Sequence, residues 1–65
     1  MNWDEVKGQW KQVMGKAKTK WGKLTDDELT QLEGRKDQLV GKLQEKYGME
    51  KEEAERQADA FVDSL

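Results

Sequence analysis

The side chains that could do acid–base or nucleophilic chemistry are few. Carboxylates stand in two clusters, one formed by Asp26, Asp27 and Glu28 and the other by Glu52 and Glu53. Both clusters fall where the first turn of a helix is expected, and the helix dipole favours acids there. The chain has no His and no Cys to serve as general base, nucleophile or metal ligand. We therefore interpret both clusters as helix starts and predict no catalytic residue, no metal site and no cofactor.

The hydroxyl side chains lead to the same prediction. Ser64 is the only serine, and it lies at the end of the last predicted helix, where fraying is expected. The threonines Thr19, Thr25 and Thr30 have no His to activate them. No calcium-binding loop and no phosphate-binding glycine pattern occurs in the chain. We expect a protein that is not an enzyme.

Lysines are the main candidates for a binding function. Residues 7–23 contain no acid and six lysines, namely Lys7, Lys11, Lys16, Lys18, Lys20 and Lys23. Trp10 and Trp21 stand among them, and lysines interleaved with aromatic residues are typical of nucleic-acid-binding surfaces. Both Trp residues also belong to the apolar stripe of the predicted helix, which favours core packing. Acidic segments follow at residues 24–34 and 49–65, so the interpretation we favour is attraction between basic and acidic helices within the fold. A small nucleic-acid-binding module is the alternative.

The hydrophobic periodicity predicts about four helices in a single domain, residues 1–65. Asn2 and Glu5 predict a capping box for a first helix that ends at Gly22. Thr25 and Glu28 predict a second capping box. Gly34 should break the following stripe into a short helix and a longer one that stops at Gly48, and a last helix should open at residues 51–53. The predicted core is the apolar stripe of these helices: Trp3, Val6, Trp10, Val13, Met14, Ala17, Trp21, Leu24, Leu29, Leu32, Leu39, Val40, Leu43, Tyr47, Ala54, Ala58, Phe61, Val62 and Leu65.

The glycines reveal an internal repeat. An offset of 26 residues aligns Gly8, Gly15 and Gly22 with Gly34, Gly41 and Gly48. We interpret the repeat as two similar helical hairpins packed on each other. Glycine inside a helix costs about 1 kcal/mol relative to alanine, so these residues need a reason. One possibility is that they mark helix ends and kinks or lie on a solvent face that tolerates them. A second is that they form a strip without side chains that a partner can approach closely. A third is that a low stability of the helices is itself useful to the protein. Gly15 and Gly41 are therefore candidate contact residues.

Four segments carry a recognisable pattern: Trp10-Lys-Gln, Gly15-Lys16, Trp21-Gly-Lys-Leu-Thr-Asp-Asp27, and Glu33-Gly with Asp37-Gln-Leu-Val-Gly-Lys-Leu-Gln-Glu-Lys-Tyr-Gly48. They resemble the CsbD family of small bacterial stress proteins. The resemblance covers nearly the whole chain and is most specific in its second half. It implies a cytoplasmic protein of the general stress response, built as a small bundle of orthogonally packed helical hairpins. The family has no established catalytic residues, so none is transferred to this chain.

Location and partners follow from the same observations. No apolar run approaches the roughly 20 residues that a membrane span needs. The first residues lack the basic start and apolar stretch of a signal peptide, so we expect a cytoplasmic protein that does not bind membranes. We expect a monomer that binds or protects an unknown macromolecular partner.

Overall fold

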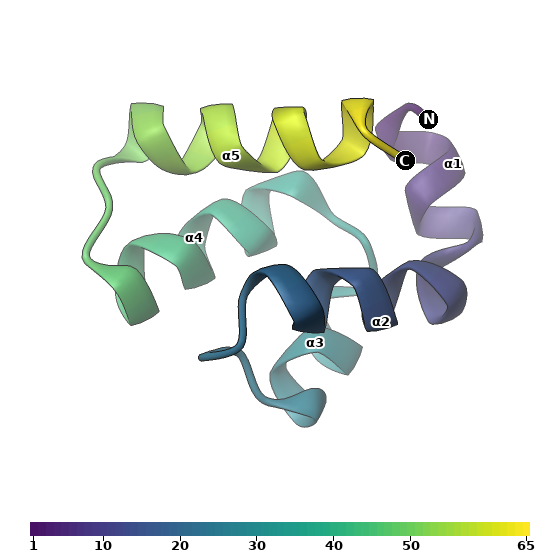
Figure 1. The fold of residues 1–65 in the computed structure, drawn as a ribbon, viewed down its shortest axis with the longest axis horizontal. Coiled ribbons are helices and arrows are strands. Elements are labelled where there is room, and N and C mark those ends of the chain that lie inside the picture. Colours follow the sequence, from purple (N-terminus) through teal and green to yellow (C-terminus); the bar gives the residue numbers. More distant parts are fainter.

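The computed structural model describes residues 1–65 as five α-helices without strands. They are α1 (Trp3–Gly8), α2 (Trp10–Lys20), α3 (Asp26–Leu32), α4 (Lys36–Tyr47) and α5 (Lys51–Asp63). α4 and α5 run in opposite directions and form the most extensive helix pair, while α2 packs on α3 and α1 crosses the end of α5 (Figure 1). The all-helical fold class is confirmed, and the predicted count of four helices is wrong.

The additional helix arises from a break at Gln9 in the segment predicted as one helix. Gln9 has φ −119° and ψ 22°, which leaves the helical region, and its N–H donates to the carbonyls of Glu5 and Val6. Gly8 directly before it is a weak helix former, so ending α1 there costs little. The break turns α1 so that Val6 is fully buried. It also brings the backbone of α1 against Gly34.

Both predicted capping boxes are confirmed. The Asn2 side chain accepts a hydrogen bond from the Glu5 N–H at 2.8 Å, and the Glu5 carboxylate accepts from the Asn2 N–H at 3.2 Å. The Thr25 hydroxyl likewise accepts from the Glu28 N–H at 3.1 Å, and the Glu28 carboxylate accepts from the Thr25 N–H at 2.9 Å. These bonds satisfy amide groups that a helix start otherwise leaves free.

The predicted breaks at Gly34 and Gly48 are confirmed, since both adopt left-handed backbone angles, with φ 77° and φ 68°. The helix end predicted at Gly22 is confirmed to within two residues, but Gly22 lacks the left-handed conformation typical of a glycine at a helix end. α2 already ends at Lys20, and Gly22 is not among the residues with positive φ. The Lys18 ammonium group instead donates to the carbonyls of Gly22 at 3.3 Å and Leu24 at 2.6 Å. This side chain satisfies carbonyl groups in the turn, so no left-handed residue is required there.

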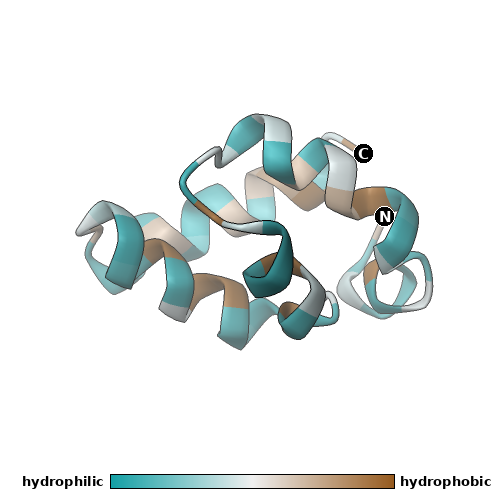
Figure 2. Cartoon of the chain, turned by 90° about the horizontal axis from the view of Figure 1, so that it is seen from below, coloured by the Kyte–Doolittle hydropathy of each residue, from teal (hydrophilic) through white to brown (hydrophobic).

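One hydrophobic core holds the helices together. Fifteen buried apolar residues form a single cluster, and the apolar bands of the helices face inward while the hydrophilic ones face solvent (Figure 2). The predicted core is confirmed, except that Trp3, Met14, Tyr47 and Leu65 are only partly buried. Met49, which was not predicted, also packs against the cluster.

The predicted arrangement of two equivalent hairpins is not confirmed. Each copy of the repeat contains a short helix followed by a longer one, α1–α2 and α3–α4. The strongest helix pair, however, is α4 with α5, and α5 lies outside the repeat. A duplicated origin of the fold therefore stays a prediction. None of the five helices combines the length and the apolar character that a membrane crossing demands.

Candidate binding groove

Three of the predicted lysines are engaged by groups of the protein itself. Lys18 is held by the turn after α2, as described above. The Lys20 ammonium group lies 5.7 Å from the ring centroid of Trp21, and that of Lys23 lies 5.1 Å from the ring centroid of Tyr47. These distances are typical of cation–π contacts, so both lysines rest on the protein's own aromatic rings.

The tryptophans of the lysine segment belong to the core. Trp10 is 7% exposed and Trp21 is 2% exposed. The indole N–H of Trp10 donates to the Leu29 carbonyl at 2.7 Å, and that of Trp21 donates to the Gln57 side chain at 3.2 Å. The Trp21 ring also lies 4.9 Å from the Phe61 ring. The core interpretation is confirmed, and base stacking on these rings would require unfolding.

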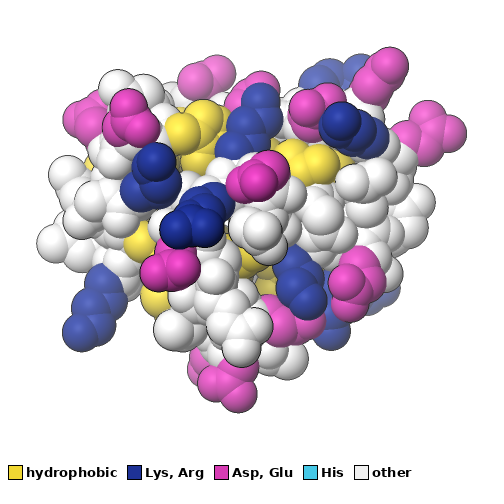
Figure 3. Space-filling view, turned by 180° about the vertical axis from the view of Figure 1, so that it is seen from behind, with side chains coloured by type: hydrophobic (Ala, Val, Ile, Leu, Met, Phe, Trp, Pro, Cys, Tyr) yellow, Lys and Arg dark blue, Asp and Glu magenta, His cyan; other side chains and the backbone are white.

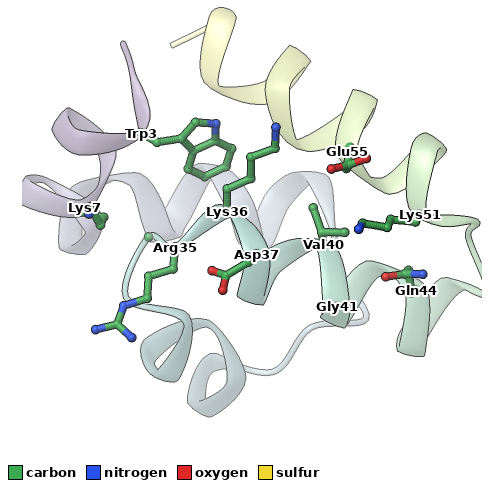
Figure 4. A pocket seen from close by; sticks show the side chains of 11 residues that line it. Trp3, Lys7, Arg35, Lys36, Asp37, Val40, Gly41, Gln44, Lys51 and Glu55 are labelled. Carbon is green, nitrogen blue, oxygen red and sulfur yellow. The ribbon is translucent and has the colours of Figure 1, made fainter.

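The largest hollow of the surface is an open groove of about 830 Å³ between α1, α4 and α5 (Figure 4). Its charged lining contains two acids, Asp37 and Glu55, and four basic residues, Lys7, Arg35, Lys36 and Lys51. In Figure 4 the Trp3 ring and the Lys36 side chain lie beside one another, and Lys51 points toward Val40. Arg35 extends to the other side of α4, at the rim of the groove.

A carboxylate at the edge of the groove joins the three helices that form it. Asp59 of α5 accepts a hydrogen bond from the Trp3 indole N–H at 3.1 Å and from the Lys36 ammonium group at 3.0 Å. The bond from Lys36, followed by the bond from Trp3, holds the pKa of Asp59 below its usual value. Trp3 and Lys36 are therefore fixed in place, and the charge of Lys36 is largely compensated.

Two basic side chains of the groove have no partner within the protein. The side chains of Arg35 and Lys51 take part in none of the hydrogen bonds or ion pairs of the chain, whereas the Lys7 side chain pairs with Asp4 at 3.5 Å. In addition, α4 and α5 begin with basic residues, Lys36 and Lys51, and neither start has a side-chain cap. The amide groups of these helix starts carry partial positive charge, which adds to the positive potential of the groove.

The lining of the groove contains more bases than acids, although Lys7 and Lys36 are paired with Asp4 and Asp59. Its lining contains two more basic than acidic residues, while the whole chain has a net charge of −2, so the remaining residues carry a net charge of −4. Figure 3 shows the face opposite to that of Figure 1, where basic side chains alternate with acids and with exposed apolar atoms.

Gly41 lies in the wall of this groove, in the middle of α4. A Cβ atom at this position would meet no atom within 4 Å, so a larger side chain would project into the groove. Gly15 has the same free space, but it lies on α2 outside the groove. Of the predicted contact residues, the groove thus contains Lys7 and Gly41. It does not contain the others, which are Lys11, Lys16, Lys18, Lys20, Lys23 and Gly15.

Most residues of the groove were not predicted from the sequence as contact residues. Trp3 was assigned to the core only, and Arg35, Lys36 and Lys51 were not singled out. One signal for two of them was present, because Lys36 and Lys51 are the first residues of helices, where acids are favoured over bases. These residues lie close together only because three helices pack against one another, and no pattern of neighbouring residues in the sequence predicts this packing.

The carboxylates of α3 have a structural role. One oxygen of Glu28 lies 3.3 Å from the Lys42 ammonium group and 3.1 Å from that of Lys46. The hydrogen bond from the Thr25 backbone, followed by the bonds from these lysines, lowers the pKa of Glu28 to about 2. Glu28 is therefore a fixed anion that ties α3 to α4, and it holds no proton to donate near neutral pH. No group of three or more side chains in the chain could hold a metal ion.

Comparison with known proteins identifies relatives of this chain. A family model described as CsbD-like matches residues 4–56. A UPF0337 protein of Pectobacterium atrosepticum is 59% identical over 63 residues, which is 97% of this chain and 91% of the relative. The UPF0337 protein YjbJ of Escherichia coli K12 is 60% identical over 57 residues, 88% of this chain and 83% of the relative. A UPF0337 protein of Bordetella pertussis is 56% identical over 63 residues, 97% of this chain and 96% of the relative. The chain therefore belongs to the CsbD-like family.

Proposed function

We propose that this CsbD-like chain is a non-enzymatic, cytoplasmic stress-response protein that binds and protects another macromolecule through the groove between α1, α4 and α5. The observation that carries the proposal is Gly41. A glycine in the middle of α4 costs about 1 kcal/mol of helix stability relative to alanine, and no neighbouring atom requires it. What its missing side chain provides is open space in a groove lined by charged residues.

Filling the groove tests this function, and the chain offers a matched pair of variants. Gly41→Gln places a neutral side chain in the groove, whereas Gly15→Gln makes the same change on α2. Both should stabilise their helices by about 0.5–1 kcal/mol, because glutamine is a better helix former than glycine. A strain that lacks the protein should regain survival under osmotic, alkaline or stationary-phase stress with Gly15→Gln but not with Gly41→Gln.

Two results would count against this function. If deletion of the protein left survival unchanged under all these stresses, the stress role would lose its support. If both variants restored survival equally, the groove would not be the working surface.

The alternative function is a nucleic-acid-binding module that uses residues 7–23. Three of its lysines contact turn carbonyls or aromatic rings of the protein itself and its tryptophans are buried, so no observation favours it over the groove. Titration of the protein with DNA and RNA at low and moderate salt decides the matter, since phosphate contacts weaken steeply with salt. Binding with that salt dependence, lost in Lys11→Ala with Lys16→Ala, would support the alternative.

A further inference from the structure

We propose that two copies of this chain exchange α1 and form a domain-swapped dimer, in which α1 and α2 of each chain join into one continuous helix. The inference goes beyond the proposed function, which needs no dimer. In the dimer each α1 would occupy, on the partner copy, the site that it occupies here on its own chain. The hinge is Gln9, the one residue between the two helices.

The sequence of α1 and α2 has the pattern of a single helix. A side-chain cap marks the start of α1 at Asn2, whereas the start of α2 at Gln9 has none. The apolar seam continues through the hinge at alternating spacings of three and four residues: Trp3, Val6, Trp10, Val13 and Ala17. Such a seam is typical of an unbroken helix that packs along one face. A straight helix over these residues therefore fits both the start signal and the apolar pattern.

The bend at Gln9 leaves backbone groups without the bonds of a continuous helix. Outside the individual helices, no backbone bond starts at the N–H of Trp10 or of Lys11. The N–H of Gln12 donates to the Gln9 carbonyl at 2.9 Å, and not to the carbonyl of Gly8 that a regular α-helix would use. Straightening would give all three amides acceptors four residues earlier in the chain. The bent hinge is thus the less completely bonded of the two conformations.

Within one chain the hinge cannot straighten without a loss from the core. Val6 of α1 is fully buried, and the backbone of α1 lies against Gly34. The Trp3 indole N–H donates to Asp59 at 3.1 Å. A helix rises about 1.5 Å per residue, so residues 3–9 would extend about 10 Å beyond the start of α2 and leave these contacts. Gly34 and Asp59 both follow the hinge in the chain, so a second copy offers the same site.

Exchange removes this conflict, because each α1 keeps its contacts while both hinges gain helical bonds. The monomer and the dimer would then differ only at Gln9 and in the association of two chains. Exchange of an identical element is a low-cost route to a dimer, and short hinges under strain favour it. The groove between α1, α4 and α5 would stay complete, since the partner's Trp3 would take the place of the chain's own in its wall.

The test is the association of a matched pair of hinge variants, Gln9→Ala and Gln9→Gly. The Gln9 side chain is exposed and caps nothing, so both variants should keep the monomer fold. Alanine favours the continuous helix and glycine disfavours it, and each dimer contains two hinges. The samples are refolded from urea at concentrations up to the millimolar range and then sedimented. The dissociation constant of the dimer should be lower for Gln9→Ala than for Gln9→Gly, by up to about 20-fold.

Isotope-filtered NMR of a dimer assembled from labelled and unlabelled chains distinguishes exchange from association of two surfaces. In the exchanged dimer the Trp3 indole N–H proton should show its NOE to the β protons of Asp59 between chains. The amides of Trp10 and Lys11 should exchange with solvent more slowly in the dimer than in the monomer, because only the dimer gives them helical acceptors.

Three outcomes would overturn the inference. The first is that Gln9→Ala stays a monomer at every concentration after refolding. The second is that both variants have the same dissociation constant. The third is a dimer in which the NOE between Trp3 and Asp59 stays within one chain. The survival assay with Gly41→Gln is independent of all three, so the proposed function stands or fails separately.

Discussion

Replacement of Gly34 by alanine should remove a large part of this protein's free energy of unfolding. Gly34 has φ 77°, and a Cβ atom built on it would lie 2.9 Å from the Lys7 Cα and 3.1 Å from the Val6 carbonyl oxygen. A left-handed backbone costs a residue with a Cβ about 1–2 kcal/mol. Overpacking costs about 1–3 kcal/mol, and the atoms met here are backbone atoms that cannot rotate away. The expected loss is therefore about 2–5 kcal/mol.

That loss is large for a chain of this length. Domains have about 0.05–0.15 kcal/mol of stability per residue, which gives about 3–10 kcal/mol for this chain. Gly34→Ala should lower the melting temperature by at least about 10 °C. Urea unfolding followed by tryptophan fluorescence and by circular dichroism measures the change in the free energy of unfolding. Amide exchange should show that α1 loses protection first, since α1 is the element pushed away.

Two further variants show which part of the reasoning holds. Gly41→Ala should be stabilising, since its Cβ has free space and its helix gains a better helix former. Gly34→Asn keeps the Cβ contact, but asparagine tolerates the left-handed backbone better than alanine does. Its loss in the free energy of unfolding should therefore be smaller than that of Gly34→Ala by the cost of the left-handed backbone. If Gly34→Ala unfolded at the same urea concentration as the wild type, the close approach of α1 to Gly34 would be refuted.

Three other predictions follow from contacts described above. Gly15→Ala and Gly41→Ala should each raise the free energy of unfolding by about 1 kcal/mol, and the double variant should show the sum, since the sites lie on different helices; urea midpoints that stay at or below the wild-type value would contradict this. The lowered pKa of Glu28 means that the unfolded chain binds its proton more readily, so this stabilisation is present above about pH 4.5 and is lost as the pH falls toward about 2. The melting temperature of Glu28→Gln should therefore fall less between these pH values than that of the wild type. If both melting temperatures fell equally, the acid sensitivity would belong to groups other than Glu28. Trp10→Phe should cost about 1–3 kcal/mol because it leaves the buried Leu29 carbonyl without its donor, and unchanged urea unfolding would show that this bond is dispensable.

The parts of the fold that were predictable depend on neighbours in the sequence. The capping boxes at Asn2 and Thr25 use residues three positions apart, and the apolar stripes follow from the period of the helix. The break at Gln9 was not predictable in this way. It serves the contact between α1 and Gly34, which joins residues far apart in the sequence. The turn after α2 was less predictable than its position, because the Lys18 side chain, and not a left-handed Gly22, satisfies its carbonyl groups.

The candidate site was less predictable than the fold. A cluster of charges in one segment drew attention to the lysines of α2, but a helix spreads successive residues around its axis. The groove instead takes Trp3 from α1, Arg35 from α4 and Lys51 from α5. No local pattern relates these positions, so only the packing of the helices could bring them together. Gly41 was found because a mid-helix glycine is unusual by itself.

The last helix sets a practical limit on where this domain can be cut. The family match stops at residue 56, although α5 continues to Asp63. Beyond the match lie Phe61, whose ring packs on Trp21, and Gln57, which binds the Trp21 indole N–H. A fragment trimmed to the matched residues would expose the Trp21 side of the core and lose Asp59, which ties α5 to α1 and α4. Boundaries for expression or fusion of such proteins should therefore follow the final turn of α5 and not the edge of the family-model match.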